Sequence, residues 1–316
     1  MMGDLILPLC ALVVGLIILI GAADILVRGA VGLADRFGTS PLITGLTVVA
    51  FGTSAPELSV SIIAAVSGSP DLTTGNIVGS NIANIGLVLG AGAMLTPVCI
   101  NRGLLIVEFP FLVLSGGLAW LFSYSGVVSR IEGMVLFAMF CGYLWFVFFK
   151  KEVAGDEIED LRPAPNLSVC RLSLYVFAGV AGLVGGSKLI VWGAVFLARY
   201  AGVSELVIGL SLTAIGTSLP ELAATVVAAR KGHGDIALGN VIGSNLANIC
   251  GVLGPVAVIS PVAVNKDVVW RDFPVMLGFT MFLYGCFALK GCVWRKVAIS
   301  LLGGYVAYLF IMSGVV

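Results

Sequence analysis

Long apolar runs, separated by short polar stretches or by Pro and Gly, occupy almost the whole chain. A helix needs about 20 mostly apolar residues to cross the hydrocarbon core of a bilayer. Dividing the 316 residues at their charged and Pro/Gly clusters gives ten such runs. We therefore predict an all-α membrane protein with ten transmembrane helices, near residues 5–27, 41–66, 72–96, 104–124, 128–149, 172–198, 205–229, 236–260, 268–289 and 293–314.

The only sizeable polar segment separates five of these runs from the other five. We predict a first five-helix repeat at 1–150, a cytoplasmic linker at 151–170 and a second repeat at 171–316. With the linker in the cytoplasm, 12 Lys and Arg residues lie on its side of the membrane and four on the other. Cytoplasmic loops carry the excess of Lys and Arg. We therefore expect a multi-pass protein of the cell (inner) membrane with both termini outside.

Composition narrows the classes of protein that fit. Hydrophobic residues make up 59% of the chain and charged residues 11%, against about 25% charged residues in soluble domains. This balance excludes an ordinary soluble protein and a disordered chain, and the net charge of zero excludes a basic nucleic-acid binder. The seven Cys include no CxxC pair, so we expect them to fill apolar space and to form neither a disulfide framework nor a zinc site.

An internal duplication is the most informative feature of the sequence. GLTVVAFGTSAPEL at 45–58 returns as GLSLTAIGTSLPEL at 209–222, and GNIVGSNIANI at 75–85 returns as GNVIGSNLANI at 239–249. Compared without gaps over 46 positions, the copies share 24 identities. Because each copy holds five spans, the second must enter the membrane from the opposite side, as an inverted-topology repeat. Such folds bind their substrate near the midplane on discontinuous helices, so we expect helices 2, 3, 7 and 8 to be broken around an ion site and access to alternate.

Oxygen-bearing side chains recur at helical spacing in the second and third spans of both copies. Side chains at i, i+4 and i+8 share one face of a helix, and this spacing defines four stripes: Thr53, Glu57 and Ser61; Thr217, Glu221 and Thr225; Asn76, Ser80 and Asn84; and Asn240, Ser244 and Asn248. Ser54 and Ser218 flank the two Glu-containing stripes. No His, Cys or Met lies among them. Ligands that are all oxygen suit Ca²⁺ and Na⁺ and not Zn²⁺ or Cu⁺.

The charge of the two glutamates indicates how such a site works. Moving one ionised carboxylate into a low-dielectric interior costs on the order of 20 kcal/mol by an idealised Born calculation, and less after relaxation. Two carboxylates about 4 Å apart repel by a further ~4 kcal/mol at an effective dielectric constant of 20. Glu57 and Glu221 therefore need cations or protons, so a loaded protein can change conformation and an empty one cannot. This favours obligatory exchange.

GTSAPE at 52–57, GTSLPE at 216–221, GSNIAN at 79–84 and GSNLAN at 243–248 resemble the paired alpha-repeat signatures of the sodium/calcium exchanger family, within the cation/Ca²⁺ exchanger superfamily. The resemblance covers nearly the whole chain. It implies ten helices and an electrogenic secondary-active antiporter that exchanges Ca²⁺ for Na⁺. The implied ion ligands, in addition to Glu57 and Glu221, are Thr53, Thr217, Ser54, Ser218, Ser80, Ser244, Asn84, Asn248 and the carbonyls of Ala50 and Ala214.

Alternatives remain at this point. Some family members have Asp where this chain has Asn248, and coupling to H⁺ or K⁺ is the alternative within transport. A cation channel lined by the same oxygens is an alternative of a different class. An intramembrane hydrolase using Ser54 or Ser218 is unsupported because no His lies within a predicted span. We expect no enzymatic activity and no cofactor; the expected partners are Ca²⁺, Na⁺ and the lipid bilayer, and a monomer is compatible with the sequence.

Overall fold

The computed structural model describes residues 2–99, 106–149, 167–202 and 216–312. The predicted 151–170 linker and the first half of the predicted seventh span lie largely outside these residues. In the first copy the elements are α1 (Met2–Phe37), α2 (Pro41–Thr44), the π-helical η1 (Gly45–Val49), α3 (Ala50–Thr53), α4 (Ala55–Val66), α5 (Pro70–Ala83), η2 (Asn84–Leu89), α6 (Gly90–Leu95), β1 (Val98–Cys99), α8 (Glu108–Ser123), β2 (Val127–Val128) and α9 (Arg130–Phe149).

The second copy repeats this order. Its elements are α10 (Val169–Tyr200), α13 (Leu219–Arg230), α14 (Gly234–Leu246), η5 (Ala247–Leu253), α15 (Gly254–Ile259), β3 (Val262–Ala263), η6 (Val268–Asp272), α16 (Phe273–Lys290), β4 (Cys292–Val293) and α17 (Arg295–Met312).

The described residues contain seven helices that are long and apolar enough to cross a membrane, or eight if one bent pair is a single span. That pair is Pro41–Thr53 with Ala55–Val66, and the two parts meet at 45°. The structure is thus an all-helical membrane protein, as predicted. The third predicted span runs as one helix, Pro70–Leu95, and the eighth runs as Gly234–Ile259. Each contains a π-helical segment where the sequence suggested a break; π-bulges often mark functional sites.

These two helices form the centre of the bundle. In each of them 78% of the most apolar 18-residue stretch is buried inside the protein, whereas the corresponding share is only 22% to 33% in the other five long apolar helices of the described residues. Small residues allow α14 to pack closely on η1: a Cβ placed on Gly239 would lie 2.7 Å from the Leu42 carbonyl oxygen. A Cβ on Gly243 would overlap the Leu46 carbonyl. This close approach brings the second predicted span of the first copy against the third span of the second copy.

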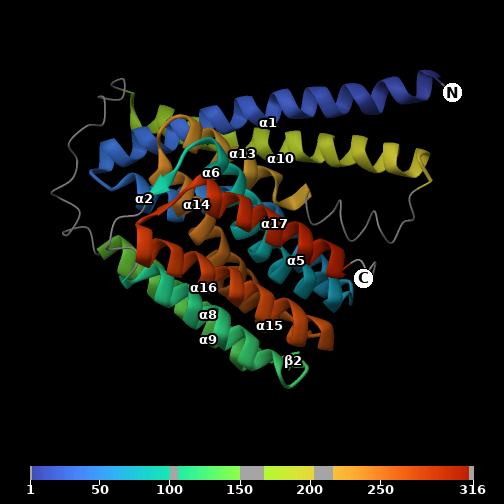
Figure 1. Cartoon of the computed structure of the whole chain (residues 1–316), viewed down its shortest axis with the longest axis vertical. Coiled ribbons are helices and arrows are strands. Elements are labelled where there is room, and N and C mark those ends of the chain that lie inside the picture. Colours follow the sequence, from blue (N-terminus) through green and yellow to red (C-terminus); the bar gives the residue numbers. More distant parts are fainter. Residues whose placement is uncertain (1, 100–105, 150–166, 203–215, 313–316) are drawn as a thin grey trace.

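The first helices of the two copies, α1 and α10, pack side by side along one edge of the bundle (Figure 1). Glycines set their spacing. A Cβ on Gly15 would lie 2.9 Å from the Gly186 carbonyl, and one on Gly193 would lie 2.7 Å from the Pro8 carbonyl. Because low numbers in α1 meet high numbers in α10, the two helices are antiparallel, which is the geometry that an inverted repeat requires.

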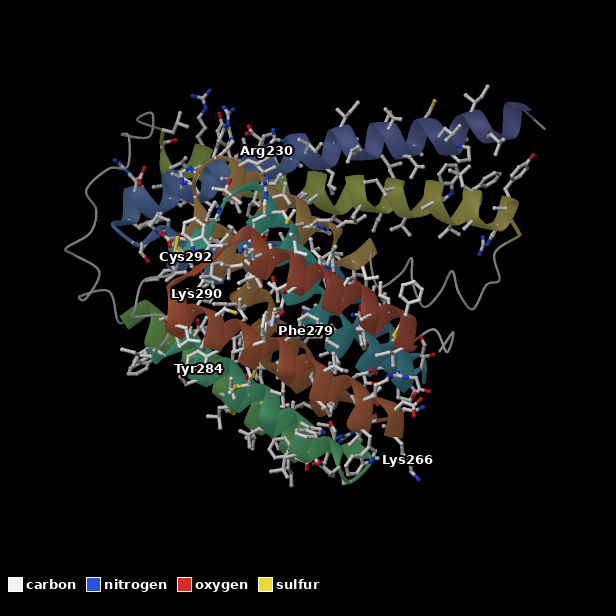
Figure 2. The ribbon with its side chains drawn as sticks, in the orientation of Figure 1. Arg230, Lys266, Phe279, Tyr284, Lys290 and Cys292 are labelled. Atoms are coloured by element: carbon white, nitrogen blue, oxygen red, sulfur yellow. A yellow bond between two sulfur atoms is a disulfide. The ribbon has the colours of Figure 1, made fainter. Side chains whose placement is uncertain are left out.

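Two short antiparallel strand pairs connect the copies. Val98 and Cys99 of β1 pair with Val293 and Cys292 of β4, and β2 pairs with β3 in the same way. The first pair also carries a disulfide, Cys99–Cys292, close to Lys290 at the end of α16 (Figure 2). Our expectation that the cysteines only fill apolar space is therefore wrong for this pair. The cysteines are 193 residues apart in sequence, and only the pairing of the strands brings them together.

Candidate functional site

Glu57 and Glu221 occupy the same position in equivalent helices. Each is the third residue of its helix, in α4 and in α13, and each follows a proline at the second position. Proline is well tolerated in a first helical turn, where its missing N–H would have no intrahelical partner. Pro56 and Pro220 therefore start helices. Both carboxylates, which have no exposed area, lie at the positive end of a helix dipole, which favours their charged form.

Asparagines of the central helices hold these two helix starts in place. The Asn76 Nδ2 group donates to the Glu57 carbonyl at 3.3 Å and to the Ser61 hydroxyl at 3.0 Å. In the second copy, Asn240 Nδ2 donates to the Glu221 carbonyl at 3.3 Å and to the Thr225 hydroxyl at 2.9 Å. The amide of each asparagine thus fixes the backbone that carries the nearby carboxylate.

The same asparagines also join the two copies. The Thr53 hydroxyl donates to Asn240 Oδ1 at 3.1 Å, and the Thr217 hydroxyl donates to Asn76 Oδ1 at 3.4 Å. A further contact runs from Asn84 Nδ2 to Asn245 Oδ1 at 3.0 Å. All of these hydrogen bonds are buried, so they bring both halves of the site into register.

The symmetry is broken at the carboxylates. The Ser54 hydroxyl donates to Glu221 Oε1 at 3.0 Å. The equivalent Ser218 hydroxyl is buried and has no hydrogen-bond partner. The two carboxylate oxygens of Glu57 are also buried and have no hydrogen-bond partner. Glu57 and Glu221 also interact electrostatically with each other. The site therefore holds two facing carboxylates, of which one is already partly hydrogen-bonded.

Unpartnered oxygen atoms occur on the helices that pack against α4 and α13. Buried polar atoms are normally hydrogen-bonded, and exceptions call for an explanation such as an ion. Among the described residues, the buried oxygens without a partner include Glu57 Oε1 and Oε2, Glu221 Oε2, the hydroxyls of Ser80, Ser218 and Ser244, and Oδ1 of Asn84 and Asn248. Asn248 Nδ2 is also without a partner, but all of the atoms able to bind a cation here are oxygens, and three belong to the two carboxylates, which suits a hard cation such as Ca²⁺ or Na⁺ as cargo.

Eleven of the twelve predicted site residues lie within the described residues, and all eleven are buried: Glu57, Glu221, Thr53, Thr217, Ser54, Ser218, Ser80, Ser244, Asn84, Asn248 and Ala50. The twelfth, Ala214, lies outside them. The Ala50 carbonyl accepts from the Ser54 amide at 2.9 Å and from the Thr53 hydroxyl at 3.3 Å. Asn84 begins η2, and Asn248 is the second residue of η5. The π-helical segments therefore carry the two amides.

Asn76 and Asn240 were recognised in the sequence as members of the stripes but were left out of the predicted site. Their hydrogen bonds link each glutamate-bearing helix to the opposite copy. A signal was available, because both asparagines repeat in register and lie four residues before a predicted serine ligand.

Comparisons with known proteins agree with this geometry. A family model described as sodium/calcium exchanger protein matches residues 7–149 and again 172–314. The inner membrane protein YrbG of Escherichia coli is 36% identical over 319 residues, covering 96% of each chain. The sodium/calcium exchanger MaX1 of Methanosarcina acetivorans is 31% identical, covering 95% of this chain and 97% of that protein.

A solved structure of the sodium-calcium exchanger NCX_Mj, soaked with Na⁺ and Ca²⁺, superposes on this chain with a TM-score of 0.84 at 33% identity and covers 98% of both chains. Family, relatives and fold agree over both repeats, and they make the chain a membrane transport protein with Ca²⁺ and Na⁺ among its expected cargo. The chain belongs to the sodium/calcium exchanger family.

Proposed function

We propose that this protein is a secondary-active antiporter that moves Ca²⁺ across the membrane in exchange for Na⁺, by alternating access and with net movement of charge. The observation that carries the proposal is the pair of fully buried carboxylates, Glu57 and Glu221, one from each inverted copy, surrounded by unpartnered oxygens. Ionisable residues within a membrane are rare and mark ion pathways. An arrangement built from both copies is able to open to either side when one part of the bundle moves against the other.

Charge explains why transport would be an exchange. Ca²⁺ neutralises both carboxylates, and two or more Na⁺ do the same. The empty site would keep two facing negative charges in a place without solvent, and each buried ion carries a penalty of several kcal/mol. The empty protein therefore does not change its access, and a cation bound from the other side has to accompany the return step.

The proposed ligands divide between the two ions. Glu57 and Glu221 hold Ca²⁺ with help from the Thr53 and Thr217 carbonyls. Na⁺ uses the serine hydroxyls and the Ala50 and Ala214 carbonyls in addition, while Asn84 and Asn248 occupy the centre. With Asn at both central positions, the site has only two carboxylates, which favours Na⁺ over H⁺ as the coupling ion.

Transport into vesicles tests the proposal. Purified protein is reconstituted with internal Na⁺, and uptake of ⁴⁵Ca²⁺ is followed after dilution into Na⁺-free buffer. We expect uptake that depends on the outward Na⁺ gradient and responds to an imposed membrane potential. Uptake under a proton gradient alone would contradict Na⁺ coupling, and flux without any cation on the far side would indicate a channel.

Two substitutions test the site itself. Glu57→Gln and Glu221→Gln should each abolish Ca²⁺ uptake while leaving a folded protein, because each removes one of the two charges that neutralise Ca²⁺. A matched control is Glu132→Gln, at the start of α9, where the carboxylate accepts from the Ser129 amide at 2.7 Å. Retained uptake in either site variant would contradict the assignment.

We also propose ten spans, with repeats at 1–150 and 171–316, a cytoplasmic linker at 151–170 and both termini outside. An epitope placed in the linker should be reached by antibody in spheroplasts only after the membrane is permeabilised. Labelling of intact spheroplasts would reverse the orientation.

A further inference from the structure

Two asparagines that lie outside the predicted ligand set, Asn76 in α5 and Asn240 in α14, have fully used amide groups. Each Nδ2 group donates two hydrogen bonds within its own copy, one to the backbone carbonyl of the nearby glutamate and one to a hydroxyl four residues further along that helix. The Oδ1 atom of each accepts from the opposite copy. The Oδ1 atoms of Asn84 and Asn248, by contrast, have no hydrogen-bond partner. Asn76 and Asn240 are therefore arranged to orient neighbouring groups rather than to offer an open oxygen to a cation.

The two hydrogen bonds from Nδ2 fix the direction of Oδ1. An amide is planar, so a carboxamide held at both of its N–H bonds cannot rotate without breaking them. Nδ2 of Asn76 lies 3.3 Å from the Glu57 carbonyl oxygen and 3.0 Å from the Ser61 hydroxyl. Its Oδ1 atom accepts from the Thr217 hydroxyl at 3.4 Å. The first copy thus places an acceptor oxygen at a fixed point beside a threonine of the second.

The threonine that meets this oxygen also lies beside a carboxylate. The Thr217 side chain is close enough to interact with Glu57, the glutamate whose backbone Asn76 holds. The hydroxyl therefore has two acceptors near it, a neutral amide oxygen and a carboxylate. The other half of the site repeats this arrangement with Thr53, Asn240 and Glu221. Thr53 has a further acceptor, the Ala50 carbonyl at 3.3 Å.

The direction of the threonine proton decides what the carboxylate offers to a cation. A hydroxyl has one proton and two lone pairs, so the proton serves one acceptor at a time. A proton given to the carboxylate would occupy a lone pair that a cation needs, and would turn the positive end of the O–H dipole toward the cation. A proton given to the asparagine avoids both effects. The structure shows the second arrangement, because the Thr217 hydroxyl donates to Asn76 and both carboxylate oxygens of Glu57 remain without a hydrogen bond.

We propose that Asn76 and Asn240 are positioning residues of the cation site. Each binds the hydroxyl proton of a threonine from the opposite copy, and thereby keeps the oxygens of the neighbouring glutamate available to Ca²⁺ or Na⁺. This role rests on the proposed function, in which Glu57 and Glu221 bind the cation. It makes the affinity for the cation depend on two residues that do not contact it, and each copy orients a hydroxyl of the other.

Binding of ⁴⁵Ca²⁺ to the purified full-length protein, in detergent and with choline in place of Na⁺, tests this role without requiring transport. Asn76→Leu is similar in size but has no acceptor, so the Thr217 proton turns to Glu57. We expect the Kd for Ca²⁺ to rise at least about tenfold, the factor that a hydrogen bond to a charged group supplies. The matched control is Asn265→Leu, at an exposed asparagine between β3 and η6, where the Kd should stay within about twofold of the wild type.

A second background separates positioning from a purely structural role. In Thr217→Val the hydroxyl proton is absent, so adding Asn76→Leu should raise the Kd by no more than about twofold. An asparagine that only held the Glu57 backbone would cost the same factor in both backgrounds, and that result would overturn the proposal. An unchanged Kd in Asn76→Leu alone would overturn it as well.

The equivalent cycle with Asn240→Leu and Thr53→Val tests the other half, and it decides if Asn76→Leu does not fold. The increase in Kd should lie between about twofold and tenfold there, because the Ala50 carbonyl remains as an acceptor for the Thr53 proton. Failure of the wild-type protein to bind Ca²⁺ would overturn the proposed function itself. Binding by the wild type, with the same Kd in both asparagine variants, would overturn only the positioning role.

Discussion

The asymmetry between Ser54 and Ser218 gives a prediction that uses one half of the molecule as the control for the other. Ser54 donates a 3.0 Å hydrogen bond to Glu221, whereas the Ser218 hydroxyl has no hydrogen-bond partner. Both serines are buried and occupy equivalent positions in the duplicated motif. Replacing each by alanine removes the same atom, but only Ser54→Ala breaks an interaction with a carboxylate.

The expected difference follows from that bond. A hydrogen bond to a charged group contributes about 1.5–3 kcal/mol to stability, and the acceptor left behind is buried. For a chain of this size, each kcal/mol corresponds to roughly 2 °C in melting temperature. Ser54→Ala should therefore melt about 3–6 °C below the wild type. Ser218→Ala should melt within about 1 °C of it, because no hydrogen bond is lost.

The measurement is thermal unfolding in detergent, followed by the fluorescence of the five tryptophans. The buffer contains choline in place of Na⁺ and a Ca²⁺ chelator, so that lost ion coordination does not contribute to the difference. Equal melting temperatures for the two variants, or a lower value for Ser218→Ala, would refute the assigned hydrogen-bond pattern. Adding Na⁺ should then raise the melting temperature of the wild type more than that of either variant, since both serines are proposed Na⁺ ligands.

Three further predictions follow from other parts of the molecule. Gly239→Ala should lower the melting temperature, because the added Cβ would lie 2.7 Å from a backbone carbonyl oxygen and overpacking costs about 1–3 kcal/mol. The control is Gly278→Ala, where a Cβ meets nothing within 4 Å; equal melting temperatures for the two variants would contradict the close packing. After cleavage at a protease site inserted in the 151–170 linker, the two halves of the wild-type chain should stay joined on a non-reducing gel through Cys99–Cys292 and separate when reductant is added. The halves of Cys99→Ser should separate without reductant, and the same behaviour in the wild type would exclude the disulfide. Burial lowers the pKa of His233 in the loop between α13 and α14. The unfolded chain therefore binds the proton more readily than the folded one, and the stability of the fold should decrease as the pH drops below about 6.5. His233→Asn should reduce this pH dependence of the melting temperature, and an unchanged dependence would contradict the assignment.

Much of the candidate site was predictable because the sequence contains it twice. A single GTSxPE segment is weak evidence, but Glu57 and Glu221 repeat in register with Asn76 and Asn240 and with Ser80 and Ser244. Period-four spacing assigns each set to one helix face. All the predicted ligands within the described residues are indeed buried.

Other features depended on contacts between copies and could not be predicted locally. The pairing of Cys99 with Cys292 requires β1 and β4 to lie side by side. The asymmetry of Ser54 and Ser218 is invisible in two nearly identical motifs. The π-helical segments at Asn84 and Asn248 were also missed, because propensity does not distinguish them from an ordinary helix.

The sequence by itself indicated the membrane environment, the duplication and the chemical type of the predicted ligands. The scarcity of charge indicates a membrane protein, the odd number of predicted spans per copy predicts inversion, and the residue types of the predicted ligands favour a hard cation. The tertiary structure decided which hydroxyl meets which carboxylate and which cysteines join. The physical reason is range: spacing along one helix is fixed by its 3.6-residue turn, whereas contacts between helices depend on how whole surfaces pack.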